Sequence, residues 1–220
     1  RPHAMEIALL ILEKNPKMAQ EVHGFQTEVT KLLGLLAKSL YSNKEVFLRE
    51  LVSNASDAVD KLRFLSLTKP ELTADDPIFS IRIKADPEAG TLSVIDNGIG
   101  MTQEDLDRNL GTIAHSDSMA FKQENAEQQG SDVDIIGQFG VGFYSAFMVA
   151  SHVKVVSRAY GEDVAHVWES DGLEGYTIEP CQKDTVGTDV IMSIKANTEE
   201  ENYDEYLAPY SLSNLIKKYS

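Results

Sequence analysis

This sequence of 220 residues has little cysteine, no long apolar run and few positive charges. Its single cysteine, Cys181, can form neither an internal disulfide nor a cysteine-based metal site, which favours a reducing compartment and predicts a cytoplasmic protein. The longest apolar run, Ile7 to Leu12, is far shorter than the roughly 20 residues of a membrane-spanning helix, so no membrane contact is predicted. The sequence has 20 Lys and Arg residues and 35 Asp and Glu residues, which gives a net charge of −15. This negative charge disfavours nucleic acid as a partner.

Several catalytic signatures are absent too. The chain has no HExxH and no GxSxG motif, which removes the common zinc-protease and α/β-hydrolase signatures. No glycine is followed by lysine, so the Walker-type phosphate loop is missing. The glycine pairs Gly98/Gly100 and Gly140/Gly142 each lack the third glycine of a dinucleotide fingerprint.

The residues that are present are typical of a folded protein, with 42% hydrophobic and 25% charged side chains. Apolar periodicity predicts helices at Phe25–Leu40 and from about Asn43 to Phe64, the second opened by a capping box of Ser42 and Glu45. Further helices are predicted at Gln103–Leu110, Val141–Ala150 and Ser211–Tyr219. Strands are predicted at Phe79–Lys84, Thr91–Ile95, Val153–Ser157, Ala165–Glu169, Tyr176–Glu179 and Thr188–Lys195. This order predicts an α+β layered domain, because its strands are mostly linked as hairpins.

Three stretches stand apart from these elements. Residues 1–23 are interpreted as a tag remnant or an extension that precedes one domain at 24–220. Residues 111–142 are long, polar and poor in apolar periodicity, which is typical of a lid over a site. The acidic run at 199–205 is interpreted as a solvated connector.

The second predicted helix carries three polar side chains on one narrow stripe. Glu50, Asn54 and Asp57 lie within about 60° of one another at 100° per residue. Taken alone, this pattern favours a solvated helix face. The alternative is the floor of a pocket, where a carboxylate acts as general base and an amide oxygen binds a cation such as Mg²⁺.

Two glycine-containing stretches offer further candidates. Residues 96–101 (DNGIGM) leave a strand and enter a turn whose glycines let a flat ligand approach the backbone, although an ordinary Asn-Gly turn has the same pattern. Residues 137–143 (GQFGVGF) open a predicted helix whose free N–H groups suit a phosphate, although such glycines also serve tight packing.

Four motifs together resemble a known family. Residues 41–57 (YSNKEVFLRELVSNASD), 96–102 (DNGIGMT), 109–114 (NLGTIA) and 136–145 (IGQFGVGFYS) are similar to the amino-terminal ATPase domain of the heat-shock protein 90 chaperones, bacterial type. The same motifs mark the wider group of DNA gyrase B, MutL and histidine kinases. The resemblance implies a two-layer α/β sandwich, with a mostly antiparallel mixed sheet and helices on one face.

The resemblance also implies roles for individual residues. Glu50 would be the general base, held by Arg49, and Asn54 would bind Mg²⁺ that bridges to the phosphates. Asp96 would accept a hydrogen bond from the adenine amino group. The remaining residues implied in binding ATP or ADP are Asp57, Lys61, Gly100, Met101, Asn109, His115, Gly137, Gly140, Val141, Gly142, Phe143 and Thr188.

The lid departs from the family pattern at two positions. His115 stands where the family usually has a phosphate-facing lysine, and Asp117 replaces a glycine. Both changes make the phosphate end less positive, since histidine is largely neutral at pH 7. We therefore expect a weakened preference for ATP over ADP.

The function implied by the resemblance is ATP hydrolysis that drives lid closure, a homodimeric clamp and the folding of client proteins with co-chaperones. Turnover by this piece alone is expected to be slow. The alternative from a different class is a nucleotide-sensing module with negligible turnover.

Overall fold

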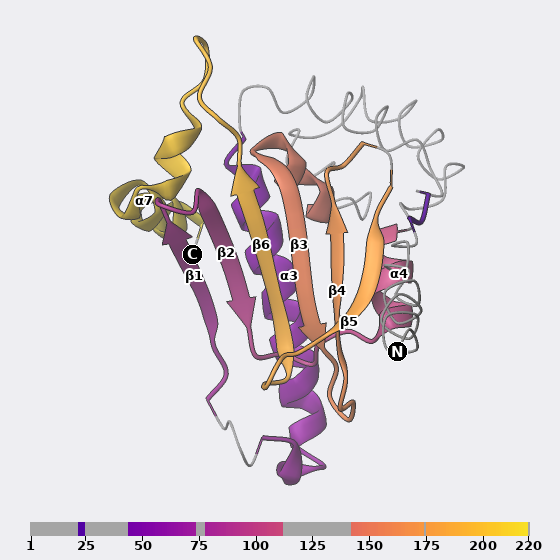
Figure 1. Cartoon of the computed structure of the whole chain (residues 1–220). Coiled ribbons are helices and arrows are strands. Elements are labelled where there is room, and N and C mark those ends of the chain that lie inside the picture. The colour runs from indigo at the N-terminus through magenta and orange to yellow at the C-terminus, as the bar shows by residue number, and fades with distance from the viewer. Residues whose placement is uncertain (1–21, 25–43, 74–77, 112–141, 174, 220) are drawn as a thin grey trace, which may run out of the picture.

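The computed structural model describes residues 22–24, 44–73, 78–111, 142–173 and 175–219. Figure 1 shows a single twisted sheet with a long helix across one of its faces. The predicted helix at Phe25–Leu40, most of the predicted lid and Ser42 of the predicted capping box lie outside the described residues.

The sheet has six strands in the order β1-β2-β6-β3-β4-β5. Their bounds are β1 Ile81–Asp86, β2 Thr91–Asp96, β3 Ala150–Arg158, β4 Ala165–Ser170, β5 Thr177–Cys181 and β6 Gly187–Ile194. All six predicted strands are confirmed to within a few residues. The sheet with a helix across one face confirms the predicted two-layer α+β fold. Every pairing between these strands is antiparallel, so the predicted "mixed" sheet is wrong for the described part of the chain.

Helix α3, Val46–Ser66, covers one face of this sheet (Figure 1). The apolar stripe of this helix is buried, as its spacing predicts, and consists of Leu48, Leu51, Ala55, Val59 and Leu62. The helix begins at Val46, slightly later than predicted, and Glu45 is its N-cap residue. Burial of the apolar stripe against the sheet leaves the opposite stripe of α3 for the site.

Helix α4, Gln103–Gly111, begins with a reciprocal cap. The Thr102 hydroxyl oxygen accepts the N–H of Asp105 at 3.1 Å, and the Asp105 carboxylate accepts the N–H of Thr102 at 3.1 Å. This is a capping box with Asp in place of the usual Glu. It fixes the start of the predicted helix at 103–110, which is confirmed.

The buried helix predicted at Val141–Ala150 is confirmed over 142–148, but it is a 3-10 helix and ends earlier than predicted. Residues Gly142–Met148 form the 3-10 helix η2, every residue of it is buried, and Ala150 already belongs to β3. The Ser145 hydroxyl donates to the carbonyl of Gly142, three residues back. That bond competes with the α-helical pattern of bonds four residues back.

The last part of the fold is the 3-10 helix η3, Tyr203–Leu207, followed by α7, Pro209–Tyr219. The predicted helix at 211–219 is confirmed. The acidic run is not solvated throughout, because Tyr203 is buried and η3 begins within the run. A short 3-10 helix, η1 (Pro70–Thr73), follows α3. No helix among the described residues has both the length and the apolar character needed to cross a bilayer.

Candidate nucleotide site

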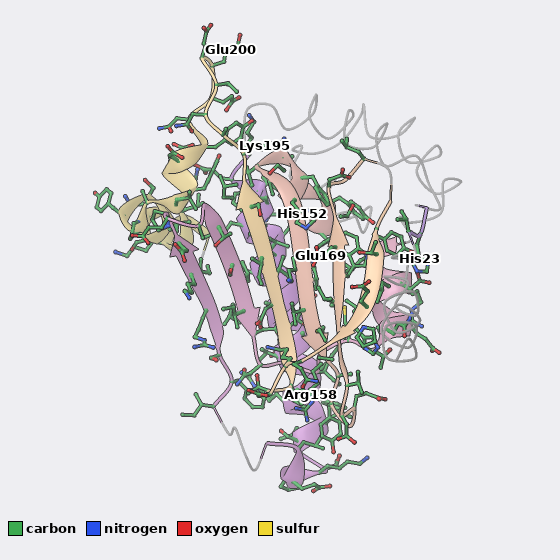
Figure 2. The ribbon with its side chains drawn as sticks, viewed as in Figure 1. His23, His152, Arg158, Glu169, Lys195 and Glu200 are labelled. Atoms are coloured by element: carbon green, nitrogen blue, oxygen red, sulfur yellow. The ribbon has the colours of Figure 1, made fainter. Side chains whose placement is uncertain are left out.

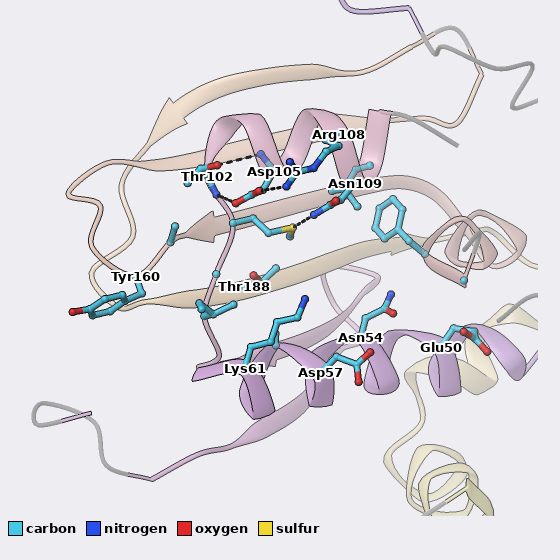
Figure 3. A pocket seen from close by; sticks show the side chains of 18 residues that line it. Glu50, Asn54, Asp57, Lys61, Thr102, Asp105, Arg108, Asn109, Tyr160 and Thr188 are labelled. Carbon is cyan, nitrogen blue, oxygen red and sulfur yellow. Dashed lines mark hydrogen bonds and ion pairs between the residues drawn. The ribbon is translucent and has the colours of Figure 1, made fainter. Parts of the chain in front are cut away.

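A cavity of about 820 Å³ lies between α3, α4, η2 and the ends of β3 and β6. Figure 3 shows the polar stripe of α3 along one wall of it. The polar side chains that line this wall are Glu50, Asn54, Asp57 and Lys61. This placement favours the pocket-floor interpretation of the stripe over a freely solvated face.

Glu50 differs from the rest of the stripe because it is buried, with 8% of its surface exposed. The Arg49 guanidinium donates to its Oε1 over 3.4 Å. On the other side, a Cβ on Gly142 would lie 2.5 Å from Glu50 Oε2. The carboxylate is thus confined between an arginine and a bare stretch of backbone at the start of η2.

Asp96 lies at the end of β2, and it too is buried. Its Oδ1 accepts the N–H of Gly98 at 2.8 Å, and a backbone hydrogen bond reaches it from Thr188. Burial raises the pKa of this carboxyl from 3.8 to about 6, although both hydrogen bonds lower it. Asp96 does not line the cavity itself, whereas Thr188, its partner across the β2–β6 ladder, does.

Ser157 is a positioning residue that the sequence analysis missed. Its buried hydroxyl accepts the N–H of Met101 at 2.8 Å and lies 2.8 Å from Thr188 Oγ1. It therefore joins β3 to the 97–101 loop and to β6. The sequence did contain a signal for it. Val153, Val155 and Ser157 occupy every second position of the strand and so share one buried face, where a serine in line with two valines is unusual.

The loop at 97–101 is held on both sides through its backbone. The N–H of Ile99 donates to Ala58 on α3 at 3.0 Å, and the carbonyl of Ile99 accepts the N–H of Tyr160 at 2.8 Å. A Cβ on Gly98 would lie 2.5 Å from the Ala58 carbonyl carbon. These contacts require glycine and fix the backbone beside the cavity.

Gly100 offers a test of this arrangement. It has φ +69°, and a Cβ there would lie 2.0 Å from the carbonyl oxygen of Arg158, whereas Gly90 has φ +67° and open space around it. We expect Gly90→Ala to lower the free energy of unfolding by about 1 kcal/mol and Gly100→Ala to lower it by about 3 kcal/mol or more. Urea unfolding of both variants measures the difference. Equal losses would contradict the close packing of this loop.

Helix α4 forms the opposite wall with Asn109, whose amide lies 4.0 Å from the Met101 sulfur. Arg108 and Tyr160 also line the cavity, and the sequence analysis missed both. Arg108 is paired with Asp105 at 2.6 Å. Both missed residues are exposed and lie outside any motif, so no sequence signal marked them.

The predicted site residues thus divide into three groups. Besides the four on α3, those that line the cavity are Gly100, Met101, Asn109, Gly142, Phe143 and Thr188. Arg49 and Asp96 adjoin it through Glu50 and Thr188. Four others lie outside the described residues, namely His115, Gly137, Gly140 and Val141.

Comparison with known proteins matches residues 41–198 to the model of the histidine kinase-, DNA gyrase B-, and HSP90-like ATPases. The chain belongs to this ATPase family. The matched residues include α3, the 97–101 loop, α4 and all six strands, so they contain the whole cavity.

The chain is most informatively compared with individual members of this family. Chaperone protein HtpG of Clostridium acetobutylicum is 57% identical over 199 residues, which cover 90% of this chain and 32% of that protein. Chaperone protein HtpG of Bacillus subtilis is 55% identical over 196 residues, which cover 89% of this chain and 31% of that protein. The chain thus spans about a third of the length of these relatives. The predicted resemblance to the amino-terminal ATPase domain of bacterial-type heat-shock protein 90 chaperones is confirmed.

Proposed function

We propose that this chain binds ATP and ADP in the described cavity and hydrolyses ATP as the amino-terminal domain of a molecular chaperone. The observation that carries the proposal is the buried Glu50 on the cavity wall, at one end of the polar stripe of α3. Names of the ATPase family and of the HtpG relatives support the same function.

The adenine would bind near Asp96. A buried carboxylate with an unused lone pair accepts a hydrogen bond from an exocyclic amine more strongly than an exposed one, because water does not compete. Thr188 on β6 supplies a hydroxyl beside it, held by Ser157 at 2.8 Å. Met101 and Gly100 supply an apolar and open wall for the flat base.

The phosphates would extend toward Gly142 and Phe143 at the start of η2, with the sugar-phosphate region near Asn109. Asp57 and Lys61 would complete the polar wall of the pocket. The donors here suit Mg²⁺, which takes oxygen ligands and binds through one or two protein groups together with substrate phosphates. Asn54 would supply the amide oxygen, and the bound ion would offset the negative charge of the phosphates.

Glu50 would act as general base. It would accept a proton from a water molecule as the water oxygen bonds to the terminal phosphorus and the bond to the ADP oxygen breaks, which yields ADP and inorganic phosphate. Arg49, in contact with Glu50, would hold the carboxylate in one orientation. A predicted lid over residues 111–142, with His115, Gly137, Gly140 and Val141, would close the phosphate end.

The proposal also includes a chaperone activity of the longer protein. In a longer protein, nucleotide-dependent lid closure would drive a homodimeric clamp that acts on client proteins with co-chaperones in the cytoplasm. The isolated chain is expected to hydrolyse ATP slowly. The second candidate, a nucleotide sensor with negligible turnover, is favoured by His115 and Asp117 in the lid sequence.

Calorimetric titration tests the binding step. ADP and a non-hydrolysable ATP analogue, each with Mg²⁺, should bind in the micromolar range, and His115→Lys should raise the affinity ratio in favour of the ATP analogue. Phosphate release from ATP then separates an ATPase from a sensor. A folded chain that binds neither nucleotide would overturn the proposed function.

Binding of adenine should depend on pH in the range where Asp96 titrates. The pKa of Asp96 is raised to about 6. The ionised carboxylate accepts the hydrogen bond from the adenine amine, so affinity is full above pH 7 and is lost as the pH falls through 6. We expect about tenfold weaker binding at pH 5 than at pH 7.

Adenosine is the right ligand for this measurement, because it carries no phosphate that titrates in the same range. A pH-independent affinity for adenosine between pH 5 and pH 7.5, with the fold intact, would exclude Asp96 from the adenine contact.

A further inference from the structure

The carboxy-terminal segment of the chain returns to the amino end of α3. Lys44, just before α3, forms an ion pair between its Nζ and Glu201 Oε1 at 2.5 Å, and it donates to the Tyr203 hydroxyl at 3.3 Å. The Lys44 side chain is only 15% exposed. The Glu201 side chain is 30% exposed, so this contact is partly shielded from water, unlike a fully exposed surface ion pair.

Two further contacts join the same parts of the molecule. Lys218 Nζ on α7 lies 2.8 Å from Glu45 Oε2, next to the start of α3. The rings of Phe47 and Tyr206 meet edge to face at 5.3 Å, and both are buried. We refer to the three contacts together, Lys44 with Glu201 and Tyr203, Glu45 with Lys218, and Phe47 with Tyr206, as the α3 clamp.

The segment that presents Glu201 is held in shape by its own hydrogen bonds. The Asn197 amide donates to Asp204 Oδ2 at 2.8 Å and accepts the N–H of Asp204 at 3.0 Å. Within that loop, the N–H of Glu201 donates to Thr198 Oγ1 at 3.1 Å, and the N–H of Thr198 donates to the carbonyl of Glu201 at 2.9 Å. The acidic run is thus an arm with its own hydrogen bonds, and these bonds connect the backbone of Glu201 to Thr198.

The clamp acts on the residues that start α3. The carbonyls of Lys44 and Glu45 accept the first turn's N–H groups, from Phe47 and Leu48, at 3.2 Å each. Glu50 follows within the next turn, confined against Gly142. Since a helix is stiff over one turn, a displacement of its first turn displaces Glu50.

We propose that the α3 clamp positions Glu50 for hydrolysis, with Lys44 and Glu201 as positioning residues. The proposal rests on the proposed function, in which Glu50 is the general base. The contacts that carry it are the partly shielded ion pair between Lys44 and Glu201 and the first-turn hydrogen bonds to Lys44 and Glu45.

The charges around Glu201 support this assignment. Lys195 is half-buried at the same end of the sheet, and burial lowers its pKa, as does the neighbouring Lys44 ammonium. The negative charge of Glu201 raises the pKa of both Lys44 and Lys195. Without the Glu201 carboxylate, two ammonium groups would repel each other, and Lys44 would move away from its place before α3.

The test compares Glu201→Gln with Glu200→Gln in this chain. Glu200 is a matched control, because it lies exposed at the tip of the same arm (Figure 2). Hydrogen exchange of the amides of residues 47–50 and the kcat of ATP hydrolysis are measured, with active sites counted by ADP titration. In Glu201→Gln, but not in Glu200→Gln, the amides of residues 47–50 should exchange faster. In the same variant kcat per ADP-binding site should fall about three- to tenfold, because a small displacement of a catalytic group lowers the rate of the chemical step.

Two more variants separate positioning from general destabilisation. Lys44→Met should give the same fall in kcat, and the double variant with Glu201→Gln should be no slower than either single one. Lys44→Arg, which keeps the charge, should restore most of the rate. ADP affinity should stay unchanged throughout, whereas partial unfolding would lower the number of ADP sites instead.

Failure of the clamp proposal and failure of the ATPase proposal give different results in these variants. If Glu201→Gln matches Glu200→Gln in kcat or in amide exchange while Glu50→Gln abolishes turnover, the clamp proposal is overturned and the ATPase proposal stands. If Glu50→Gln retains turnover, or if the unaltered chain gives no phosphate above background, the ATPase proposal fails and takes the clamp proposal with it.

Discussion

Replacing Glu50 by glutamine should lower ATP turnover by about 100-fold or more, the usual contribution of a positioned general base. The side chain keeps its shape and its contact with Arg49, but it no longer accepts a proton from water. Nucleotide affinity should change little, because proton transfer stabilises the transition state and not the bound ground state. Single-turnover phosphate release and ADP calorimetry on the same preparation give the two quantities.

Asp60→Asn is the control for that experiment. Asp60 is on the same helix and loses the same charge, but it is exposed, pairs with Arg63 and does not line the cavity. Turnover in this variant should equal that of the unaltered chain. A Glu50→Gln variant that hydrolyses ATP at the original rate would assign the base to another group.

Replacing Asp96 by asparagine should weaken the binding of ADP and of ATP analogues by about 100-fold, since a hydrogen bond to a charged group contributes about 1.5–3 kcal/mol and its loss leaves the adenine amine facing an amide. The asparagine oxygen can still accept the N–H of Gly98, which Asp96 accepts at 2.8 Å. Burial also disfavours the charge of Asp96, so a neutral amide at this place costs less to bury. The variant is therefore expected to fold.

Asp189→Asn provides the matched comparison. Asp189 lies on β6 beside Thr188, and its carboxylate accepts from Lys183 at 2.8 Å instead of lining the cavity. Its removal should leave ADP affinity within about twofold, as is usual away from a binding contact. Full ADP binding by Asp96→Asn would show that the base binds elsewhere.

Much of this arrangement follows from short-range patterns. The apolar stripe of α3 and the alternation in β1 and β2 each depend on one period along the chain, so the helix, the hairpin and the polar stripe with Glu50 were all predictable. The motif at 96–102 could be assigned to the site only through its resemblance to a family, because an Asn-Gly turn has the same local pattern.

The rest depends on contacts between distant residues. The 3-10 geometry of η2 arises where Phe143 packs on Trp168 at 5.3 Å and Ser145 bonds back to Gly142, and no local period encodes these contacts. The role of Ser157 requires Met101 and Thr188 to meet it from two other segments. The contact of the acidic arm with Lys44 likewise joins two residues that lie far apart in the sequence.

The place of β6 in the sheet has a consequence for synthesis of the chain. This strand is the last of the six in the sequence, yet it pairs with β2 on one side and β3 on the other. During translation, β2 and β3 therefore each have one unpaired edge until β6 has left the ribosome. Unpaired strand edges make nascent chains prone to aggregation. Asp96 meets Thr188 only at that moment. If ATP binds there as proposed, it would stabilise the nascent domain only after nearly all of that domain has been translated.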